Sequence, residues 1–408
     1  MTTAAECIAR LFPDSDNELV ISGRPVSAWM QAIGRSPAYL YSRAVIEARV
    51  RELRARLSPD IHIHYAVKAN PNPAVVRFLL SMTDGADVAS AGELALALDA
   101  GAKPEHISFA GPGKRNDELT MAVAKGVTIH CESVNELARI NRLASAANTT
   151  AKVAVRVNPD FSVRASGMKM GGGAQPFGID AEMVPAVLSR WPEHCRFMGF
   201  HIFSGSQNLH LEAIEQALMQ TCRLVDALAA HAPEPPILLN LGGGWGIPYF
   251  ANDKPLALTE LAEIVNRHTS HLRQRYPSAQ VIFELGRFLV GEAGVYVCQI
   301  VDIKYSRGKR FYVVDGGLHH HLAASGNFGQ VIRKNYPVAV INRLRAPETE
   351  PTNVVGPLCT PLDKLAENLP LPDAEVGDWI GVFQSGAYGL SASPTAFLSH
   401  PRAEERLL

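Results

Sequence analysis

The stretch HIHYAVKANPNPAVVRFLLSMTDGADVASAGELALALDA, residues 62–100, carries the pattern from which the fold can be inferred. It contains two short strand-like runs, His62–Val67 and Ala86–Ala89, and the second leads into the helix-periodic segment ELALALDA. The same alternation of short strand-like runs and longer helical patterns extends over residues 36–290. Alternation of this kind predicts a sheet of parallel strands with helices packed on it.

Six more strand-like runs follow in this region: Ile107–Ala110, Val127–His130, Lys152–Val157, Phe197–Ile202, Ile237–Leu241 and Val281–Glu284. Helical patterns such as SVNELARINRLASAA, LEAIEQALMQTCRLVDALAA and LTELAEIVNRHTSHLRQRY separate them. Ser90-x-x-Glu93 and Ser133-x-x-Glu136 have the spacing of capping boxes. Eight strand–helix units in roughly 250 residues predict an α/β fold of the (β/α)8 TIM-barrel type. An open, doubly wound sheet shares the alternation and is the alternative.

The pattern changes after residue 290. The runs GVYVCQIVDIKYSRG, KRFYVVDGG, PVAVINRLR, TNVVGP and DWIGVF are strand-like and are separated by Gly, Pro and charged turns. We therefore expect a C-terminal all-β domain of the sandwich or barrel kind over residues 291–408. Residues 36–290 would form the barrel. Residues 1–35 fit no barrel unit and are expected to join the β domain.

Composition narrows the function classes. The chain has 408 residues, of which 47% are apolar and 19% charged, as in globular proteins. Its net charge of −1 argues against a surface built for nucleic acid or an anionic membrane. We find no run of about 18 apolar residues and no secretory signal in MTTAAECIARLF. Six scattered cysteines argue against a disulfide framework or a structural zinc site, so a cytoplasmic enzyme is expected.

Polar and glycine residues gather where the predicted strands end. They are Lys68, Asp87, His201, the triglycine Gly242-Gly243-Gly244, Glu284 and Arg287. In a barrel these strand ends share one face, which is where active sites are built. A lysine there can lose its proton and form a Schiff base, although a solvated strand-end lysine is the ordinary interpretation. The triglycine can bind phosphate through backbone N–H groups, or it can be a plain tight loop.

A lysine, a triglycine, a histidine and a carboxylate on one face suggest a single cofactor, pyridoxal 5'-phosphate. This cofactor needs a lysine for its aldehyde, donors for its phosphate, a flat side chain against its ring and a partner for its pyridine nitrogen. The run His319-His320-His321 suggests a metal. However, adjacent residues on a strand point to opposite faces, and no carboxylate completes a ligand set, so no metal site is expected.

Seven separated motifs, in order along the chain, resemble the alanine-racemase-fold group of pyridoxal-phosphate decarboxylases. The resemblance is strongest to diaminopimelate decarboxylases and weaker to ornithine and arginine decarboxylases. It covers nearly the whole chain and implies a barrel with a β domain and a homodimer with shared active sites. The motifs are YAVKANPNP (65–73), GADVASAGEL (85–94), HIFSGSQ (201–207), NLGGGWG (240–246), ELGR (284–287), GPLCTPLD (356–363) and GAYG (386–389).

The resemblance also implies residue roles. Lys68 would hold the cofactor, His201 would stack on its ring, and Asp87 would lie close to both. Glu284 would face the pyridine nitrogen, and Cys359 would reach across from the partner subunit as a catalytic residue. The phosphate would be bound by Ser204, Gly242, Gly243, Gly244, Arg287 and Tyr388, with Gly286 among the cofactor-binding residues.

A carboxylate at the pyridine nitrogen favours decarboxylation. It keeps that nitrogen protonated by opposite-charge stabilisation, whereas alanine racemases of this fold place an arginine there. In the expected cycle the substrate amine displaces Lys68, the α-carboxylate leaves as CO2, and Cys359 or Lys68 returns a proton to Cα. A pyridoxal-phosphate racemase and a non-catalytic cofactor-binding member of the fold are the alternatives.

Several substrate-side positions depart from the family pattern. Thr360 stands where an acidic residue is usual, and no arginine follows the Asp-Gly-Gly motif until Arg333. The family's tyrosine-asparagine near the C-terminus is replaced by AFLSHPRAEE. Loss of a charged partner matters greatly for specificity. These changes predict a different amino acid or a conjugate, such as an aminoacyl group on a carrier protein or a precursor in a secondary-metabolite, siderophore or exopolysaccharide pathway.

The distal substrate pocket would then be shaped by Thr360, Asp363, His319, His320 and Tyr388. The alternative is that Arg164, Lys169 or Arg333 supplies the missing charge and that the substrate is meso-diaminopimelate, as in lysine biosynthesis.

Overall fold

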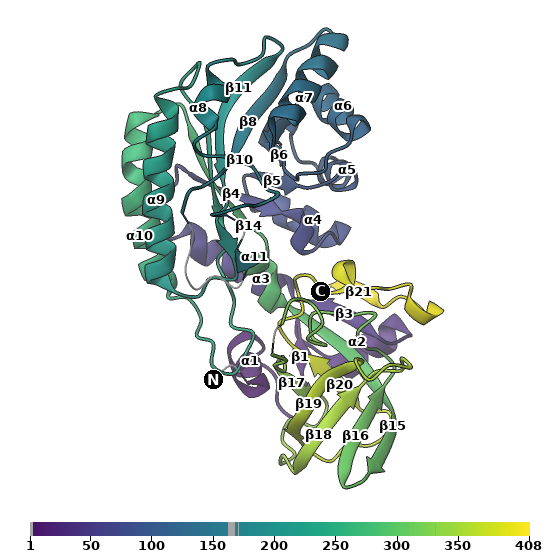
Figure 1. Cartoon of the computed structure of the whole chain (residues 1–408). Coiled ribbons are helices and arrows are strands. Elements are labelled where there is room, and N and C mark those ends of the chain that lie inside the picture. The colour runs from purple at the N-terminus through teal and green to yellow at the C-terminus, as the bar shows by residue number, and fades with distance from the viewer. Residues whose placement is uncertain (1–2, 162–167, 170, 331) are drawn as a thin grey trace. The chain divides into compact units, whose positions relative to one another are not determined.

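The computed structural model describes residues 3–161, 168–169, 171–330 and 332–408, which divide into two compact units (Figure 1). The barrel unit contains Arg49–Gly246 and Pro255–Phe288. The β unit contains the residues up to Ala48, Ile247–Lys254 and Leu289–Leu408. Among the described residues, no helix combines the length and apolar character needed to cross a membrane.

The strands of the barrel unit close on themselves. Each of eight parallel strands in the described chain pairs with the next, and the last pairs back with the first. The predicted (β/α)8 barrel is therefore confirmed, and the open sheet is excluded. The strands are β4 (Ile61–Ala66), β5 (Gly85–Val88), β6 (Ile107–Phe109), β7 (Thr128–Cys131), β8 (Ala151–Asn158), β11 (Cys195–Ile202), β13 (Leu238–Gly243) and β14 (Gln280–Leu285).

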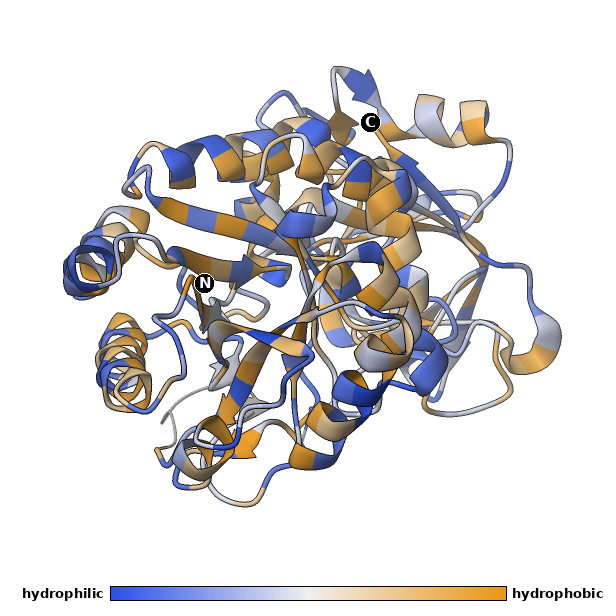
Figure 2. Cartoon of the chain, turned by 90° about the horizontal axis from the view of Figure 1, so that it is seen from above, coloured by the Kyte–Doolittle hydropathy of each residue, from blue (hydrophilic) through white to orange (hydrophobic). Residues whose placement is uncertain are grey.

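Helices of the barrel unit bury one face each. Along α9 the buried apolar residues Ile214, Leu218, Val225 and Leu228 recur at helical spacing. Figure 2 accordingly shows hydrophilic and hydrophobic residues mixed along single helices. The helices wholly in this unit are α4 (Pro73–Leu80), α5 (Ala91–Asp99), α6 (Asn116–Lys125), α7 (Val134–Ala146), α8 (Val184–Leu188), α9 (Leu211–Ala229) and α10 (Leu258–Arg275). Helices α3 (Arg43–Arg54) and α11 (Arg287–Val290) contain residues of both units.

The two predicted capping boxes form only in part. Ser90 accepts the N–H of Glu93 at 3.1 Å, as predicted. The Glu93 carboxylate, however, accepts the N–H of Ala89 at 2.7 Å and not that of Ser90. Glu136 likewise accepts the N–H of Glu132, one residue before its serine cap. The glutamates therefore satisfy the donor at the end of the preceding strand.

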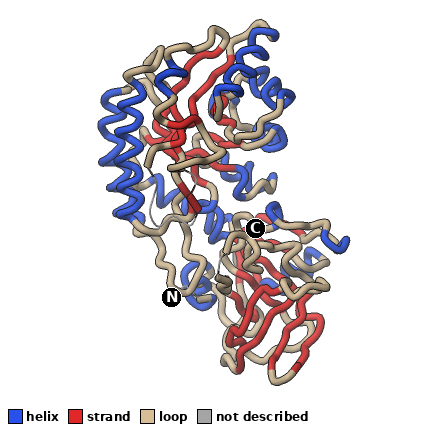
Figure 3. Tube along the Cα trace, viewed as in Figure 1, coloured by secondary structure: helices blue, strands red, loops and turns tan. Residues whose placement is uncertain are grey.

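The β unit is mostly strand and loop, whereas helices alternate with strands in the barrel unit (Figure 3). A mixed sheet has the order β17-β20-β15-β16-β18-β19, so the predicted second β domain is confirmed. Its strands are β15 (Gly294–Ser306), β16 (Lys309–Val314), β17 (Val338–Val340), β18 (Glu350–Val355), β19 (Lys364–Leu371) and β20 (Trp379–Val382). Short strands elsewhere are β1 (Val20–Ile21), β2 (Arg24–Pro25), β9 (Met168–Lys169), β10 (Ile179–Asp180) and β12 (Gly205–Ser206).

Both ends of the chain contribute to the β unit. Helices α1 (Ala4–Leu11) and α2 (Val26–Ile33) supply Cys7 and Met30 to a core that also contains Phe383. Strand β3 (Ala38–Tyr41) lies in the segment that the sequence assigned to the barrel, yet it pairs with β15 and with β21 (Glu404–Leu407). A local pattern could not reveal this pairing because both partner strands lie in the last third of the chain.

Candidate active site

A cavity lies at the carboxyl ends of the barrel strands. It brings together four of the predicted site residues: Lys68 in the turn after β4, Asp87 on β5, His201 on β11 and Glu284 on β14. The other lining residues are Ala66, Val88, Ala89, Ala110, Arg156 and Phe203. The barrel face inferred from the strand ends therefore holds a concave site with several convergent polar groups.

Lys68 differs from its neighbours in being exposed. Its Nζ atom lies 5.6 Å from the ring centroid of Phe203, within the range of a cation–π contact. Asp87, His201 and Glu284 are all buried. Lys68 therefore lies at the open side of the cavity.

The pKa values of the two carboxyl groups in the cavity are shifted in opposite directions. Burial by itself would raise the pKa of Glu284, but His201, Lys68 and Arg156 together lower it to about 2. Burial, and next the charge of Glu284, raise the pKa of Asp87 well above its ordinary value despite the nearby Lys68. The two environments therefore push the pKa values of neighbouring carboxyl groups apart, a pattern typical of catalytic sites.

Two buried histidines that the sequence reasoning missed lie beside this pair. The ring of His130 on β7 lies 4.3 Å from that of His201. On β4, the Nδ1 atom of His64 is 3.8 Å from Oδ2 of Asp87. A Cβ atom at Gly85 would come within 2.6 Å of the His64 ring, so this glycine makes room for it. Their position as polar residues within otherwise apolar strands could have indicated that both histidines belong to the site.

A buried chain of charges reaches the cavity from β7 and was also missed. Nη1 of Arg156, which lines the cavity, donates to Glu132 at 2.7 Å. The backbone N–H of Glu132 is held by Glu136, and Glu136 is in turn paired with Lys114 at 2.8 Å. These four side chains are at most 6% exposed. Because the pairs leave no net charge, Arg156 is held in place inside the barrel without an uncompensated buried ion.

The triglycine and Gly286 allow close approach of backbone. Gly244 has φ +72°, and a Cβ atom there would lie 1.9 Å from the carbonyl oxygen of Gly205. A Cβ atom at Gly243 would lie 2.3 Å from the carbonyl oxygen of Glu284, and one at Gly286 would lie 2.8 Å from Ala69. Gly242 donates its N–H to Asn240 at 2.9 Å, which shapes the loop. Ser204 adjoins this loop, and Arg287 is the first residue of α11.

The remaining predicted residues lie in the β unit. Cys359 is exposed, whereas the other five cysteines are buried. Tyr388 has φ +53°, a strained conformation that often marks functional sites. Asp363 accepts the N–H groups of Leu318 at 2.6 Å and of Leu358 at 2.9 Å, so its carboxylate already holds the loop that contains Cys359 and Thr360.

The run His319-His320-His321 lies in a turn, and the strand geometry that we assumed for it is wrong. All three histidines are buried. The rings of His319 and His320 lie 3.8 Å apart, His320 contacts the carbonyl oxygen of Pro401 at 2.8 Å, and His321 contacts Ser385 at 2.8 Å. The described residues contain no metal-ligand cluster.

The barrel cavity fits pyridoxal phosphate. Within the described chain, Nδ1 of His201 and both carboxylate oxygens of Asp87 are buried without a well-aligned hydrogen bond. Such atoms are costly unless another group pairs with them. The glycine loop beside them provides a cradle that a side chain would fill. A flat, polar ring with a phosphate group suits both features.

Comparison with known proteins agrees with this geometry. Residues 43–291 match the family described as "Pyridoxal-dependent decarboxylase, pyridoxal binding domain". The chain is 41% identical to the L-glutamyl-[BtrI acyl-carrier protein] decarboxylase of Niallia circulans, over 91% of this chain and 88% of that protein. It is 32% identical to the diaminopimelate decarboxylase of Aquifex aeolicus, over 96% and 91%.

A solved structure agrees as well. Diaminopimelate decarboxylase from Helicobacter pylori, complexed with L-lysine, superposes with a TM-score of 0.83 at 27% identity, covering 93% of this chain and 94% of that one. The family match spans the whole barrel, including the cavity, and the relatives extend through the β unit. This chain therefore belongs to the pyridoxal-dependent decarboxylases and is an amino-acid carboxy-lyase that uses pyridoxal phosphate.

Proposed function

We propose that this decarboxylase removes the α-carboxylate of an aminoacyl group that is tethered to a carrier protein through its side-chain carboxyl group. The observation that carries this proposal is the environment of Arg333. It is the first arginine after the Asp-Gly-Gly motif, and a free distal carboxylate on the substrate would need such a cation.

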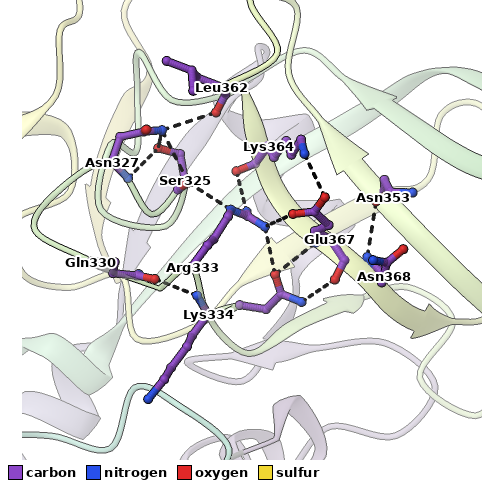
Figure 4. A network of polar contacts seen from close by, with 11 residues as sticks. Ser325, Asn327, Gln330, Arg333, Lys334, Asn353, Leu362, Lys364, Glu367 and Asn368 are labelled. Carbon is purple, nitrogen blue, oxygen red and sulfur yellow. Dashed lines mark hydrogen bonds and ion pairs between the residues drawn. The ribbon is translucent and has the colours of Figure 1, made fainter.

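The guanidinium of Arg333 is occupied within the β unit (Figure 4). Its Nε donates to the carbonyl oxygen of Ser325 at 3.0 Å, and Nη2 donates to that of Lys364 at 2.8 Å. Nη1 donates to Asn335 at 3.2 Å and lies 3.5 Å from a carboxylate oxygen of Glu367. Its donors therefore join the segments of Ser325 and Asn335 to strand β19, which leaves Arg333 poorly suited to binding a substrate carboxylate.

The other two candidate cations give no support to the alternative. Arg164 lies outside the described residues, as does the side chain of Lys169. A thioester at the distal end is neutral and needs no cation. Because the reaction requires a free α-carboxylate, such a thioester has to be at the side-chain carboxyl group. Similarity to a glutamyl-carrier decarboxylase supports the same substrate class.

The proposed roles of the cavity residues follow from their positions. When bound, pyridoxal phosphate supplies an electron sink for the charge left on Cα as CO2 departs. The ε-amino group of Lys68 holds the cofactor and gives way to the substrate amine. Glu284 keeps a proton at the pyridine nitrogen, and His201 packs against the ring. Within the barrel unit, the phosphate would be held by Ser204, Gly242, Gly243, Gly244, Gly286 and Arg287.

We further propose a homodimer in which the partner's Cys359, or Lys68, returns the proton to Cα. The loop of Cys359 also exposes Leu362, which is 58% exposed, and Asn327 donates to its carbonyl oxygen. Phe328, next in the chain, is 44% exposed. Exposed apolar side chains beside the Cys359 loop suit a subunit contact. In the proposed dimer, Thr360 would lie near the distal end of the substrate.

The dimer can be tested by mixing two inactive variants, Lys68→Ala and Cys359→Ala. If sites are shared, random exchange of subunits restores roughly a quarter of wild-type activity, because half of the dimers then contain one intact site. Each variant alone stays inactive if Cys359 returns the proton, whereas a Cys359→Ala protein with wild-type activity would assign that step to Lys68. Absence of any restored activity after demonstrated subunit exchange would contradict the shared site.

The substrate is tested by CO2 release from purified, cofactor-loaded protein. Three substrates are compared at equal concentration: γ-glutamyl carrier protein, free glutamate and meso-diaminopimelate. We expect release mainly from the carrier-linked substrate. Preference for meso-diaminopimelate would overturn the proposal in favour of that alternative. Incorporation of solvent deuterium at Cα without CO2 release would instead indicate racemisation.

A further inference from the structure

We infer that Asn240 is a positioning residue of the cofactor site, because its one side chain joins the glycine loop to the carboxylate of Glu284. Asn240 is on β13 and is 1% exposed. Its Oδ1 atom accepts the N–H of Gly242 at 2.9 Å, and its Nδ2 atom donates to Oε2 of Glu284 at 3.4 Å. All three residues belong to the barrel unit.

The position on the strand explains why the side chain is inside the barrel. Successive residues of a strand point to opposite faces. Leu241, the next residue, lines a cavity with Ile214 and Leu218 of α9, on the helix side of the sheet. Asn240 therefore points to the barrel interior, where Glu284 of the neighbouring strand β14 also points.

The amide is matched to both contacts. Its carbonyl oxygen accepts from the loop, and its NH2 group donates to the carboxylate. An aspartate would keep the acceptor but would place a second carboxylate beside Glu284, whereas a leucine of similar size would offer neither group. Nε2 of His201 contacts the same oxygen, Oε2 of Glu284, at 3.4 Å. The amide thus gives one oxygen of an almost fully buried carboxylate its second contact.

This inference rests on the proposed roles of the glycine loop and of Glu284. One contact of Asn240 fixes the loop proposed to hold the phosphate, and the other fixes the carboxylate proposed to face the pyridine nitrogen. Gly242 has φ +72°, and its N–H is the first of the triglycine. Fixing this N–H orients the backbone at the start of the loop proposed to hold phosphate. Fixing Glu284 sets the distance from that loop to the carboxylate proposed to face the pyridine nitrogen.

The experiment compares Asn240→Asp and Asn240→Leu with wild type and with Asn135→Leu, a surface control on α7. Three quantities are measured on the full chain: the Kd for pyridoxal phosphate, the visible spectrum of the bound cofactor, and kcat. Asn240→Leu should raise the Kd about tenfold, since both hydrogen bonds are lost. Asn240→Asp should leave the Kd within about threefold but alter the spectrum and lower kcat about tenfold.

Either of two results would overturn the inference. One is an unchanged Kd and spectrum in Asn240→Leu, and the other is an unchanged spectrum and kcat in Asn240→Asp. If Asn240→Leu does not fold, Asn240→Asp decides alone, because it keeps the volume and the loop contact. The Kd and spectrum need no substrate. Failure of wild type on carrier-linked substrates would therefore reject the proposed substrate without affecting this result.

Discussion

The Nε2 atom of His201 lies 3.4 Å from the Oε2 atom of Glu284, and both side chains are almost fully buried at the carboxyl ends of β11 and β14. This contact is among the causes that keep the pKa of Glu284 at about 2 although burial opposes it. An ionised carboxylate is thus available in the cavity at any pH near neutrality. Burial and the charge of Glu284 raise the pKa of the neighbouring Asp87 well above its ordinary value.

Replacement of Glu284 by glutamine tests the role of this charge. The change keeps the shape of the side chain but removes the group that we propose to stabilise a protonated pyridine nitrogen. We expect kcat to fall by roughly 10²-fold or more, the loss typical of a preorganised electrostatic contact. CO2 release measures the rate, and visible absorbance measures the bound cofactor.

Glu263→Gln is the matched control for that variant, because Glu263 is exposed on α10 of the same unit. It should leave kcat unchanged. A Glu284→Gln protein that is fully loaded with pyridoxal phosphate and still turns over at the wild-type rate would exclude the proposed role.

Substitution of Gly244 by alanine should disrupt the glycine loop. Its φ of +72° is strained for any other residue, and the added Cβ atom would lie 1.9 Å from the carbonyl oxygen of Gly205. Since backbone cannot yield as a flexible side chain does, we expect affinity for pyridoxal phosphate to fall by at least about tenfold. The Kd is measured by titration of visible absorbance.

Gly126→Ala separates backbone strain from the steric clash. Gly126 has φ +71°, but nothing lies within 4 Å of the Cβ position. It ends α6, remote in sequence from the loop, so this variant should lose stability without losing cofactor affinity. Equal affinity in the Gly244 and Gly126 variants would show that close approach at Gly244 is unimportant.

The barrel and much of its cavity could be predicted because their signals are local. Strand-like runs and helical spacing fixed the order of elements, and polar residues at strand ends marked one face. Lys68, Asp87, His201 and Glu284 share one cavity for this reason. Strand β3 was misplaced because its partners β15 and β21 are distant in sequence.

Side-chain roles were harder to predict, since a residue type does not reveal its partner. Asp363 was expected at the substrate, yet its carboxylate holds two backbone N–H groups. His320 was expected there as well, but it contacts Pro401. Conversely, Arg156 in the strand-like run VAVRV was not predicted as a site residue, although it lines the cavity. Such pairings depend on contacts between distant segments.

Arg310 should be essential for the stability of the β unit. It is 1% exposed and donates to Thr352 at 2.7 Å, to the carbonyl oxygen of Leu371 at 2.8 Å and to Asp373. Arg310→Met leaves these acceptors without their donor, and we expect a loss of about 3 kcal/mol in the free energy of unfolding.

Urea denaturation of Arg310→Met is compared with that of Arg345→Met. The Arg345 side chain is 70% exposed and forms an ion pair with the similarly exposed Asp16. Exposed pairs contribute little, so this control should change stability by less than about 1 kcal/mol. Similar midpoints for the two variants would contradict the importance of the buried contacts.

Acid should destabilise the β unit through its buried histidines. Burial lowers the pKa of His321 to about 3, and burial followed by the nearby His320 and His400 lowers that of His319 to about 3. In the unfolded chain a histidine has a pKa of about 6.5. Between these values the unfolded state binds more protons, so stability falls as the pH drops below about 6.5 and the loss levels off near 3.

The contribution of one histidine can be isolated with His321→Gln. Each histidine that stays neutral in the fold costs about 1.4 kcal/mol per pH unit in this window. Removing His321 should therefore reduce the slope of unfolding free energy against pH, measured by urea denaturation from pH 6.5 to 4.5, by about that amount. His231→Gln, at an exposed position, should leave the slope unchanged. If both variants kept the wild-type slope, protonation of His321 would not be what limits stability in acid, and the loss would have to come from other groups.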